Sequence, residues 1–468
     1  MPNPSRGFER LRGERVLLVG CGRESTALAR RLLGDDPNPV VVALDGRSGD
    51  AVEAWRKEFG ASAPVVVWGA SDQVPAEVSS STIAVMSPGV PRTGDLYQWV
   101  ATLGIPYTSG SALFVADHSD HMGGITGSKG KSTTSALTHH LLVHSGVQAA
   151  LAGNMGIPVQ GIDPADFYVV ELSSYQCHYL EHSPAIVVFT ALFPEHLDWH
   201  GSEQVYYDDK LSLARDESAV VIVNAEDEVL VSQFTSRYPK RDVIWVGAGH
   251  PWHLEPDDEG ESWLVHGSRR LGHTKNLKLV GKHNHQNALL AVVAASTTGL
   301  LSEDAIEAAL STFSPLPHRL QVIEDPSGVK FVNDSLATNP QATVSALQAL
   351  TDSGVVLLVG GADRGVDYQV LVDQVVATPP IAILGLPDSG HALIDQCGKA
   401  LAEAGMPDQV ILETVSGMAE AVRRARELAS AGDYVALSPA APSFGHYRDF
   451  AHRAEDFVNA IEHTKEGM

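Results

Sequence analysis

Residues 124–134, with the sequence GITGSKGKSTT, constrain the fold more than any other stretch of this chain. A glycine-rich turn that ends in Lys-Ser-Thr can place backbone N–H groups around phosphate oxygens. Lys131 would then reach the terminal phosphates, and the hydroxyl of Ser132 or Thr133 would ligate Mg²⁺. The apolar residues that follow recur at helical spacing, so the turn opens a helix whose N-terminus favours an anion. We therefore predict a strand, loop and helix that bind ATP, although Ile125 replaces the first glycine of the usual pattern. The alternative is a structural turn before a surface helix.

Length and composition limit the class of protein. The chain has 468 residues, enough for about three domains of ordinary size. Its formal charge of −24 argues against a nucleic-acid partner and against an anionic membrane surface. The three cysteines, Cys21, Cys177 and Cys397, lie far apart and offer neither a disulfide framework nor a metal-binding pair. With no apolar leader and no long apolar run, we expect a cytoplasmic protein.

The first hundred residues alternate between apolar runs and helical patterns. A strand at 15–19 runs into Gly20-Cys21-Gly22, and a second strand at 39–44 ends at Asp45. This resembles a Rossmann opening, but Ser25 stands where the third glycine of the dinucleotide pattern belongs. The turn is therefore compatible with a nucleotide diphosphate, with a dinucleotide, or with a purely structural role.

In the middle of the chain, polar residues follow successive predicted strands. A strand at 167–170 leads to Glu171, and another at 186–192 leads to Glu195 and His196. Because parallel strands present their carboxyl ends to one cleft, these residues suggest a metal–phosphate site. Residues 243–279 alternate in polarity and predict a small antiparallel insert.

The last third again alternates strand and helix, which predicts a doubly wound sheet. The overall prediction is an α/β protein of three domains: a Rossmann-like domain at 1–110, a central ATP-binding domain at 111–315 and a dinucleotide-fold-like domain at 316–468.

Taken together, the motifs resemble the Mur ligase family over nearly the whole chain, in particular the branch that adds glutamate to UDP-N-acetylmuramoyl-L-alanine. The resemblance rests on residues 126–133, 171–176, 195–198, Lys210, His283-Asn284 with Asn287, and residues 317–319, 333–335 and 437–439. It implies that ATP phosphorylates the substrate carboxylate and that the amine of glutamate then attacks the acyl phosphate. The family also implies ATP and Mg²⁺ as cofactors, a UDP-binding first domain, a glutamate-binding third domain and a monomer.

The resemblance carries residue roles onto this sequence. It implies catalytic roles for Lys131, Glu171, His196 and Lys210, with Mg²⁺ held by Ser132, Glu171, His196 and Lys210. Lys210 matches a lysine that CO₂ converts to a carbamate, because an unmodified ammonium would repel the metal. Contacts to ATP are implied for Gly127, Ser128, Lys129, Gly130, Lys131, Ser132, Thr133, Asn284, Asn287, Arg319 and Asp334. Contacts to UDP-muramoyl-alanine are implied for Gly22, Arg23, Asp45, Ser87, Gly89, Asn154, Ser173 and Gln176.

The glutamate pocket departs from the pattern of the D-glutamate enzymes. Those enzymes carry a lysine directly after Asn-Asp-Ser, where this chain has Leu336, and Arg364 replaces a second family lysine. A desolvated carboxylate needs a paired partner, so these changes should alter how glutamate is held. We therefore expect L-glutamate, with Arg364 and Ser443 as pocket residues. The alternatives are D-glutamate, a folylpolyglutamate synthase, a dehydrogenase that uses Gly20-Cys21-Gly22, and a non-catalytic nucleotide-binding protein.

Overall fold

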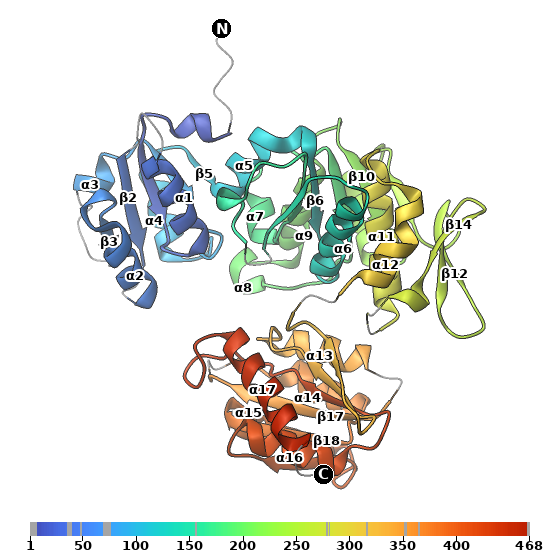
Figure 1. Ribbon diagram of the computed structural model, residues 1–468. Helices are drawn as coiled ribbons and strands as arrows, with labels where there is room; N and C mark the ends of the chain where they lie inside the picture. The colour runs from blue at the N-terminus through green and yellow to red at the C-terminus, as the bar shows by residue number, and fades with distance from the viewer. Residues whose placement is uncertain are drawn as a thin grey trace. The chain divides into compact units, whose positions relative to one another are not determined.

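Three sheets with helices packed against them make up the computed structural model (Figure 1). The structure describes residues 7–34, 40–46, 49–68, 76–154, 157–277, 279, 281–314, 317–350, 353–363 and 366–465. Contacts divide the chain into two units, Met1–Leu277 with His285–Phe313, and Lys278–Asn284 with Ser314–Met468. The predicted α/β class is confirmed, whereas the residue bounds of the three predicted domains stay a prediction.

The first sheet has the strand order β3-β2-β1-β4-β5 and is parallel throughout. Its strands are β1 (Arg15–Val19), β2 (Val40–Asp45), β3 (Val65–Val67), β4 (Ile83–Met86) and β5 (Tyr107–Ser109). The helices of this region are α1 (Arg23–Gly34), α2 (Asp50–Phe59), α3 (Ala76–Ser79) and α4 (Asp95–Thr102). The apolar residues of β1 after Arg15 are fully buried, as expected for the central strand of a parallel sheet. Strand order reverses between β1 and β4, so the turns after these two strands border one crevice.

The second sheet has the order β14-β13-β12-β11-β10-β9-β6-β8-β7. Its parallel part contains β6 (Met122–Thr126), β7 (Ala149–Gly153), β8 (Phe167–Glu171), β9 (Ile186–Phe189), β10 (Val220–Asn224) and β11 (Ile244–Val246). The strands β12 (Trp252–Pro256), β13 (Ser262–His266) and β14 (Arg269–His273) form an antiparallel insert as predicted, but it begins later than residue 243, because β11 pairs parallel with β10. The helices of this region are α5 (Gly110–His118), α6 (Lys131–His144), α7 (Ser174–His178), α8 (Leu197–His200), α9 (Glu203–Leu211), α10 (Glu228–Arg237), α11 (His283–Thr297) and α12 (Ile306–Thr312).

The third sheet has the order β15-β16-β20-β17-β18-β19, with only its edge strand β15 antiparallel. Its strands are β15 (Gln321–Glu324), β16 (Lys330–Asn333), β17 (Val355–Gly361), β18 (Ala382–Asp388), β19 (Ile411–Thr414) and β20 (Tyr434–Leu437). One apolar layer packs α13 (Pro340–Ala349), α14 (Gln369–Ala377) and α15 (Ser389–Glu403) on the sheet, and another packs α16 (Met418–Leu428) and α17 (Phe450–Lys465). Helices therefore cover both faces, as the predicted doubly wound sheet requires.

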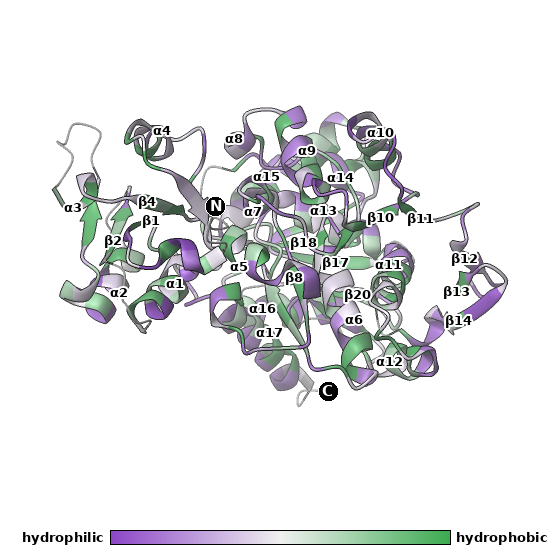
Figure 2. Cartoon of the chain, turned by 90° about the horizontal axis from the view of Figure 1, so that it is seen from above, coloured by the Kyte–Doolittle hydropathy of each residue, from purple (hydrophilic) through white to green (hydrophobic). Residues whose placement is uncertain are grey.

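The hydropathy of the strands differs between the parallel sheets and the antiparallel insert. In Figure 2 the strands β1 and β2 are largely green, whereas β14 is largely purple. Parallel strands with helices on both faces need apolar side chains on both sides, whereas the antiparallel insert has one face in water. Over the described residues, none of the helices combines the length and the apolar character needed to cross a bilayer.

Candidate functional site

The turns after β1 and β4 meet at the crevice of the first sheet. Gly20 has φ of +93°, and a Cβ built on it would lie 2.9 Å from the Cβ of Ser87. A Cβ on Gly22 would lie 3.6 Å from the Ser87 hydroxyl oxygen. The backbone N–H of Cys21 donates to the Asp45 carboxylate at 2.9 Å. The crevice thus unites Gly22, Asp45 and Ser87, with Arg23 and Gly89 exposed beside them. Their contact with UDP stays a prediction.

The phosphate loop joins β6 to α6 as predicted. Gly130, the residue before α6, has φ of +86°, a conformation that glycine adopts without strain. A Cβ on it would lie 2.4 Å from the side-chain oxygen of Asn287, so α11 closely approaches this loop. Gly127 has φ of +150°, and a Cβ there would collide with Thr190. The loop therefore needs glycine at both positions.

Side chains of the loop point in different directions. The hydroxyl of Ser128 lies 2.8 Å from that of Tyr206 and donates to the Phe193 carbonyl. These bonds attach the phosphate loop to the segments that carry Phe193 and Tyr206. Lys129 approaches Glu195 at 3.9 Å. Ser132 is buried in the first turn of α6, followed by the half-buried Thr133. The start of a helix, with free backbone N–H groups, suits an anion.

Two lysines share one carbonyl oxygen of this loop. The amine of Lys131 donates to the Gly127 carbonyl at 2.9 Å, and the amine of Lys210, from α9, donates to the same oxygen at 2.6 Å. Lys210 is 2% exposed, and no carboxylate among the described residues pairs with it. Burial, together with the Lys131 charge, lowers the pKa of Lys210 to about 7. The Gly127 carbonyl thus brings both lysine side chains to the phosphate loop.

Glu171 ends β8 with one carboxylate oxygen unsatisfied. Its Oε1 accepts a hydrogen bond from the Asn154 amide at 2.8 Å, whereas its buried Oε2 has no partner in the described part of the chain. An unpaired buried carboxylate oxygen is costly and calls for an explanation such as a missing ion. Oxygen ligands from Glu171 and Ser132 are of the kind that Mg²⁺ takes, so these residues fit the metal that the family implies.

His196 occupies a strained backbone position. It precedes α8 with φ of +56°, which is uncommon for a residue other than glycine. Its exposed ring packs 5.0 Å from that of Tyr175. Strain of this kind often accompanies function, but metal binding by His196 stays a prediction.

Ser173 and Gln176 form a capping box at the start of α7, a feature that the sequence analysis did not identify. The Gln176 side-chain oxygen accepts from the Ser173 backbone N–H at 2.9 Å, and the Ser173 hydroxyl accepts from the Gln176 backbone. The Gln176 amide donates to Glu24 of α1 at 2.6 Å and to Ser111 at 3.0 Å. Gln176 therefore links the first region to the second, and its predicted contact with substrate would replace one of these bonds.

Glu24 is a titratable group in this link. Its Oε2 is buried without a partner among the described residues, and burial raises its pKa to about 7 despite the hydrogen bond from Gln176. Between the ordinary carboxyl pKa and about 7 the folded protein binds more protons than the unfolded chain, so stability should fall as pH rises through this window.

Glu24→Gln should therefore stabilise the protein at pH 8 and change its stability little at pH 4. Urea titrations at both pH values test this, and a stabilisation equal at both would contradict it.

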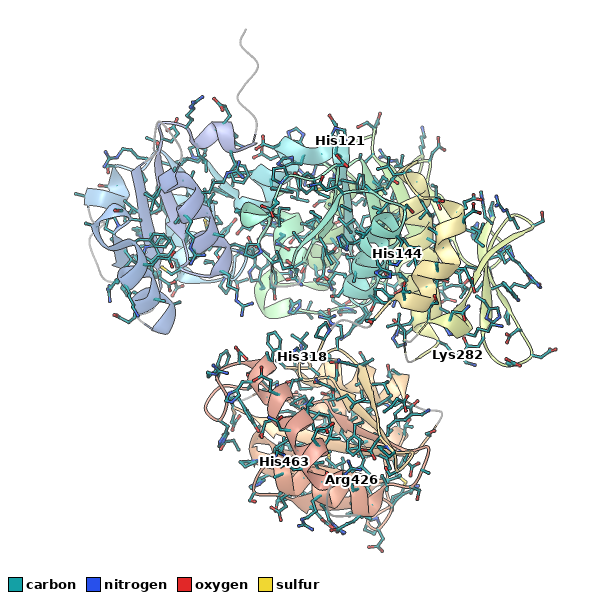
Figure 3. All side chains as sticks on the ribbon, viewed as in Figure 1. His121, His144, Lys282, His318, Arg426 and His463 are labelled. Carbon is teal, nitrogen blue, oxygen red and sulfur yellow. The ribbon has the colours of Figure 1, made fainter. Side chains whose placement is uncertain are left out.

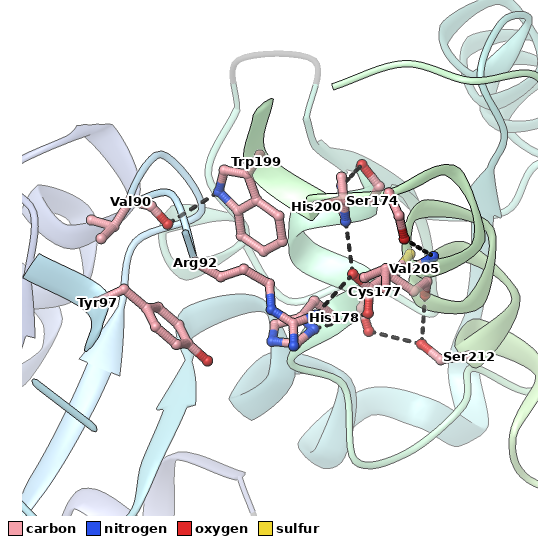
Figure 4. A network of polar contacts seen from close by, with 12 residues as sticks. Val90, Arg92, Tyr97, Ser174, Cys177, His178, Trp199, His200, Val205 and Ser212 are labelled. Carbon is pink, nitrogen blue, oxygen red and sulfur yellow. Dashed lines mark hydrogen bonds and ion pairs between the residues drawn. The ribbon is translucent and has the colours of Figure 1, made fainter. Parts of the chain in front are cut away.

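A polar network ties the loop after β4 to α7, α8 and α9 (Figure 4). Asp209 accepts from His178 at 2.9 Å and from His200 at 2.7 Å, and Arg92 lies 3.7 Å away. The indole N–H of Trp199 donates to the Val90 carbonyl at 3.1 Å. Asp209 directly precedes Lys210, so the network fixes the helix that carries this lysine. The only sign of this network in the sequence is that an acidic residue precedes Lys210. Such neighbours are common on helix surfaces, so the sign does not predict the network.

The second unit contains other predicted residues, of which Asp334 directly follows β16. Asp334 accepts from the Ser438 hydroxyl at 2.8 Å and from the Leu320 backbone at 3.2 Å. Arg319, the residue before Leu320, is exposed, and Ser443 is buried in the loop after β20. Asn284, in the first turn of α11, is also buried. Arg364 lies outside the described residues, so its predicted role is untested.

Comparisons with known proteins agree with this architecture. Residues 125–295 match the model of the Mur ligase middle domain, and residues 318–441 match that of the Mur ligase glutamate ligase domain. A protein from a Micromonospora species is 41% identical over 97% of this chain and 98% of its own length. A Salinispora tropica protein is 40% identical with the same coverage. Both are named UDP-N-acetylmuramoyl-L-alanine–L-glutamate ligase. The chain belongs to the Mur ligase family.

Solved structures support the same fold. The UDP-N-acetylmuramate–alanine ligase MurC of Thermotoga maritima has a TM-score of 0.59 and 17% identity, over 96% of this chain and all of that chain. A MurF structure from Acinetobacter baumannii has a TM-score of 0.58 and 16% identity, over 96% of this chain and 93% of its own. At this level of identity the likeness concerns the fold, and the predicted three-domain Mur ligase architecture is confirmed.

Proposed function

We propose that this protein joins L-glutamate to UDP-N-acetylmuramoyl-L-alanine in an ATP-dependent reaction of peptidoglycan precursor synthesis. The names of relatives that align over nearly the whole chain support the substrates. The geometric observation that carries the proposal is the convergence of Lys131 and Lys210 on one carbonyl of the phosphate loop. We place the reaction in the cytoplasm and expect the enzyme to act as a monomer.

The chemistry needs an activated carboxylate. An oxygen of the alanine carboxylate attacks the γ-phosphorus of ATP, an O–P bond forms, and ADP leaves. The glutamate nitrogen then attacks the acyl carbon, the bond from this carbon to the phosphate oxygen breaks, and phosphate leaves as the amine loses a proton. Lys131 would stabilise negative charge on the transferred phosphoryl group, and the N-terminus of α6 would hold the other phosphates. Mg²⁺, when bound, would supply positive charge that offsets the charge of the phosphates.

Lys210 would serve as a carboxylate rather than as an amine. The ammonium would lose one proton, and its neutral nitrogen would add to CO₂, forming an N–C bond and releasing a second proton, so that a buried cation becomes an anion. Burial without a carboxylate partner supports this, because an unpaired buried ammonium is costly. With Glu171, Ser132 and His196, the carbamate would complete the proposed metal ligands.

The ATP and substrate contacts are proposed as the family implies them. Gly127 to Thr133, with Asn284, Asn287, Arg319 and Asp334, would bind ATP, and the crevice of the first sheet would bind UDP. Asn154, Ser173 and Gln176 would contact the muramoyl-alanine part. Arg364 and Ser443, with Leu336 in place of the lysine of the D-glutamate enzymes, would form the pocket for L-glutamate.

An ADP-release assay tests the amino acid. With UDP-N-acetylmuramoyl-L-alanine, ATP and Mg²⁺ present, we expect L-glutamate to give ADP at least about tenfold faster than D-glutamate at equal concentration. Omitting the UDP substrate, or replacing it with a folate, serves as the control and should give background release. A clear preference for D-glutamate would contradict the proposal.

A further inference from the structure

Arg453 is a buried cation in the third-sheet region. It lies in the first turn of α17, and its side chain is 1% exposed. Its Nε donates to the Ser335 hydroxyl at 3.1 Å, and its Nη2 donates to the Ser335 carbonyl at 2.9 Å. Its Nη1 donates to the Ala441 carbonyl at 2.9 Å. All of these acceptors are neutral, and they use three of the five N–H groups of the guanidinium.

Arg426 of the same unit, whose side chain is 5% exposed, has a carboxylate partner. Arg426, labelled in Figure 3, forms a bidentate pair with the buried Asp325 at 2.9 and 2.8 Å. Among the described residues no carboxylate forms an ion pair with Arg453, and burial lowers its pKa to about 10. Buried charges in proteins are normally paired, because an uncompensated charge is expensive to desolvate. The unpaired charge of Arg453 therefore needs an explanation.

The guanidinium lies beneath three loops at one edge of the sheet. Ser335 follows β16, Ala441 follows β20, and Gly361 ends β17. A Cβ on Gly361 would lie 3.0 Å from Nη1 of Arg453, so this strand end closely approaches the cation. The carboxyl edge of a parallel sheet is where such folds bind ligands, and Leu336 and Ser443, which we assign to the glutamate pocket, follow β16 and β20 there.

We propose that Arg453 supplies the positive charge that draws one carboxylate of the incoming glutamate onto these loops. The inference rests on the proposed function and adds a residue that determines specificity. Through its bonds to Ser335 and Ala441 the guanidinium also fixes the two loop backbones. A bound carboxylate would compensate the charge that the fold leaves unpaired, and a neutral amide would not.

The test measures how KM changes when the charge of Arg453 is removed and when one carboxylate of the substrate is replaced by a neutral amide. L-glutamate, L-glutamine and the α-amide of L-glutamate are assayed with wild type, Arg453→Met and the matched control Arg426→Met. We expect Arg453→Met to raise KM for L-glutamate on the order of 30-fold, and to change KM for at least one amide less than threefold. Arg426→Met should leave the preference for L-glutamate over both amides unchanged, whatever its effect on stability.

Arg453→Lys keeps the charge and provides the second variant where the methionine variant does not fold. It should keep the preference for glutamate over the amides within about threefold of wild type. The proposal is overturned if Arg453→Met raises KM equally for glutamate and both amides, if Arg453→Met leaves KM for glutamate unchanged, or if Arg453→Lys loses the preference for glutamate over the amides. Failure of the proposed function is a separate result, because wild type would then release no ADP with L-glutamate.

Discussion

Lys210→Ala is expected to lower the rate of ADP release on the order of 10³-fold, the scale seen when a group that stabilises charge in the transition state is removed. Alanine leaves a space where the side chain was, next to the Gly127 carbonyl. If the working group is a carbamate, formate or acetate should occupy this space and restore part of the rate. The measurement is initial ADP release with increasing concentrations of each acid at constant ionic strength.

Two comparisons make this result specific. Lys210→Met fills the space with an apolar side chain and should be inactive without rescue, although it removes the costly buried amine and should fold well. Methylamine and ethylamine would replace an amine rather than a carboxylate, so they should not rescue Lys210→Ala. Rescue by the amines and not by the acids would mean that Lys210 works unmodified, and it would contradict the carbamate.

The succession of strands along the chain and the phosphate loop were predictable, because each depends on a local sequence pattern. Apolar runs such as the one before Gly20, and the glycine-rich turn before Lys131, specify strand, turn and helix without long-range information. The antiparallel pairing of β15 was not predicted, because a four-residue edge strand has little pattern of its own.

Pairings between distant residues could not be predicted from one sequence. Gln176 meets Glu24 across 152 residues, and Arg453 meets Ser335 across 118. Nothing near Arg453 in the sequence indicates that its charge stays unpaired, because pairing depends on which carboxylates the fold brings near. The same limit applies to Asp209, whose partners come from three separate segments.

Gly127→Ala is expected to weaken nucleotide binding strongly and to lower activity with it. The added Cβ would lie 2.1 Å from the Thr190 hydroxyl oxygen and 2.9 Å from both the backbone nitrogen and the oxygen of Ala191. A side chain could rotate away, but backbone atoms of the loop after β9 cannot, and φ of +150° is itself strained for alanine. We expect ADP affinity to fall at least about 100-fold and the free energy of unfolding to fall by about 2–3 kcal/mol.

Gly146→Ala provides the matched control, because Gly146 follows the other end of α6. It also has a positive φ, of +81°, but a Cβ there would meet nothing within 4 Å. It should cost about 1 kcal/mol of backbone strain and leave ADP affinity unchanged. Calorimetric titration with ADP and urea unfolding measure both effects. Equal loss of ADP affinity in the two variants would mean that general destabilisation is responsible. A loss confined to Gly127→Ala would mean that contact with Thr190 and Ala191 sets the loop, and with it the carbonyl on which Lys131 and Lys210 converge.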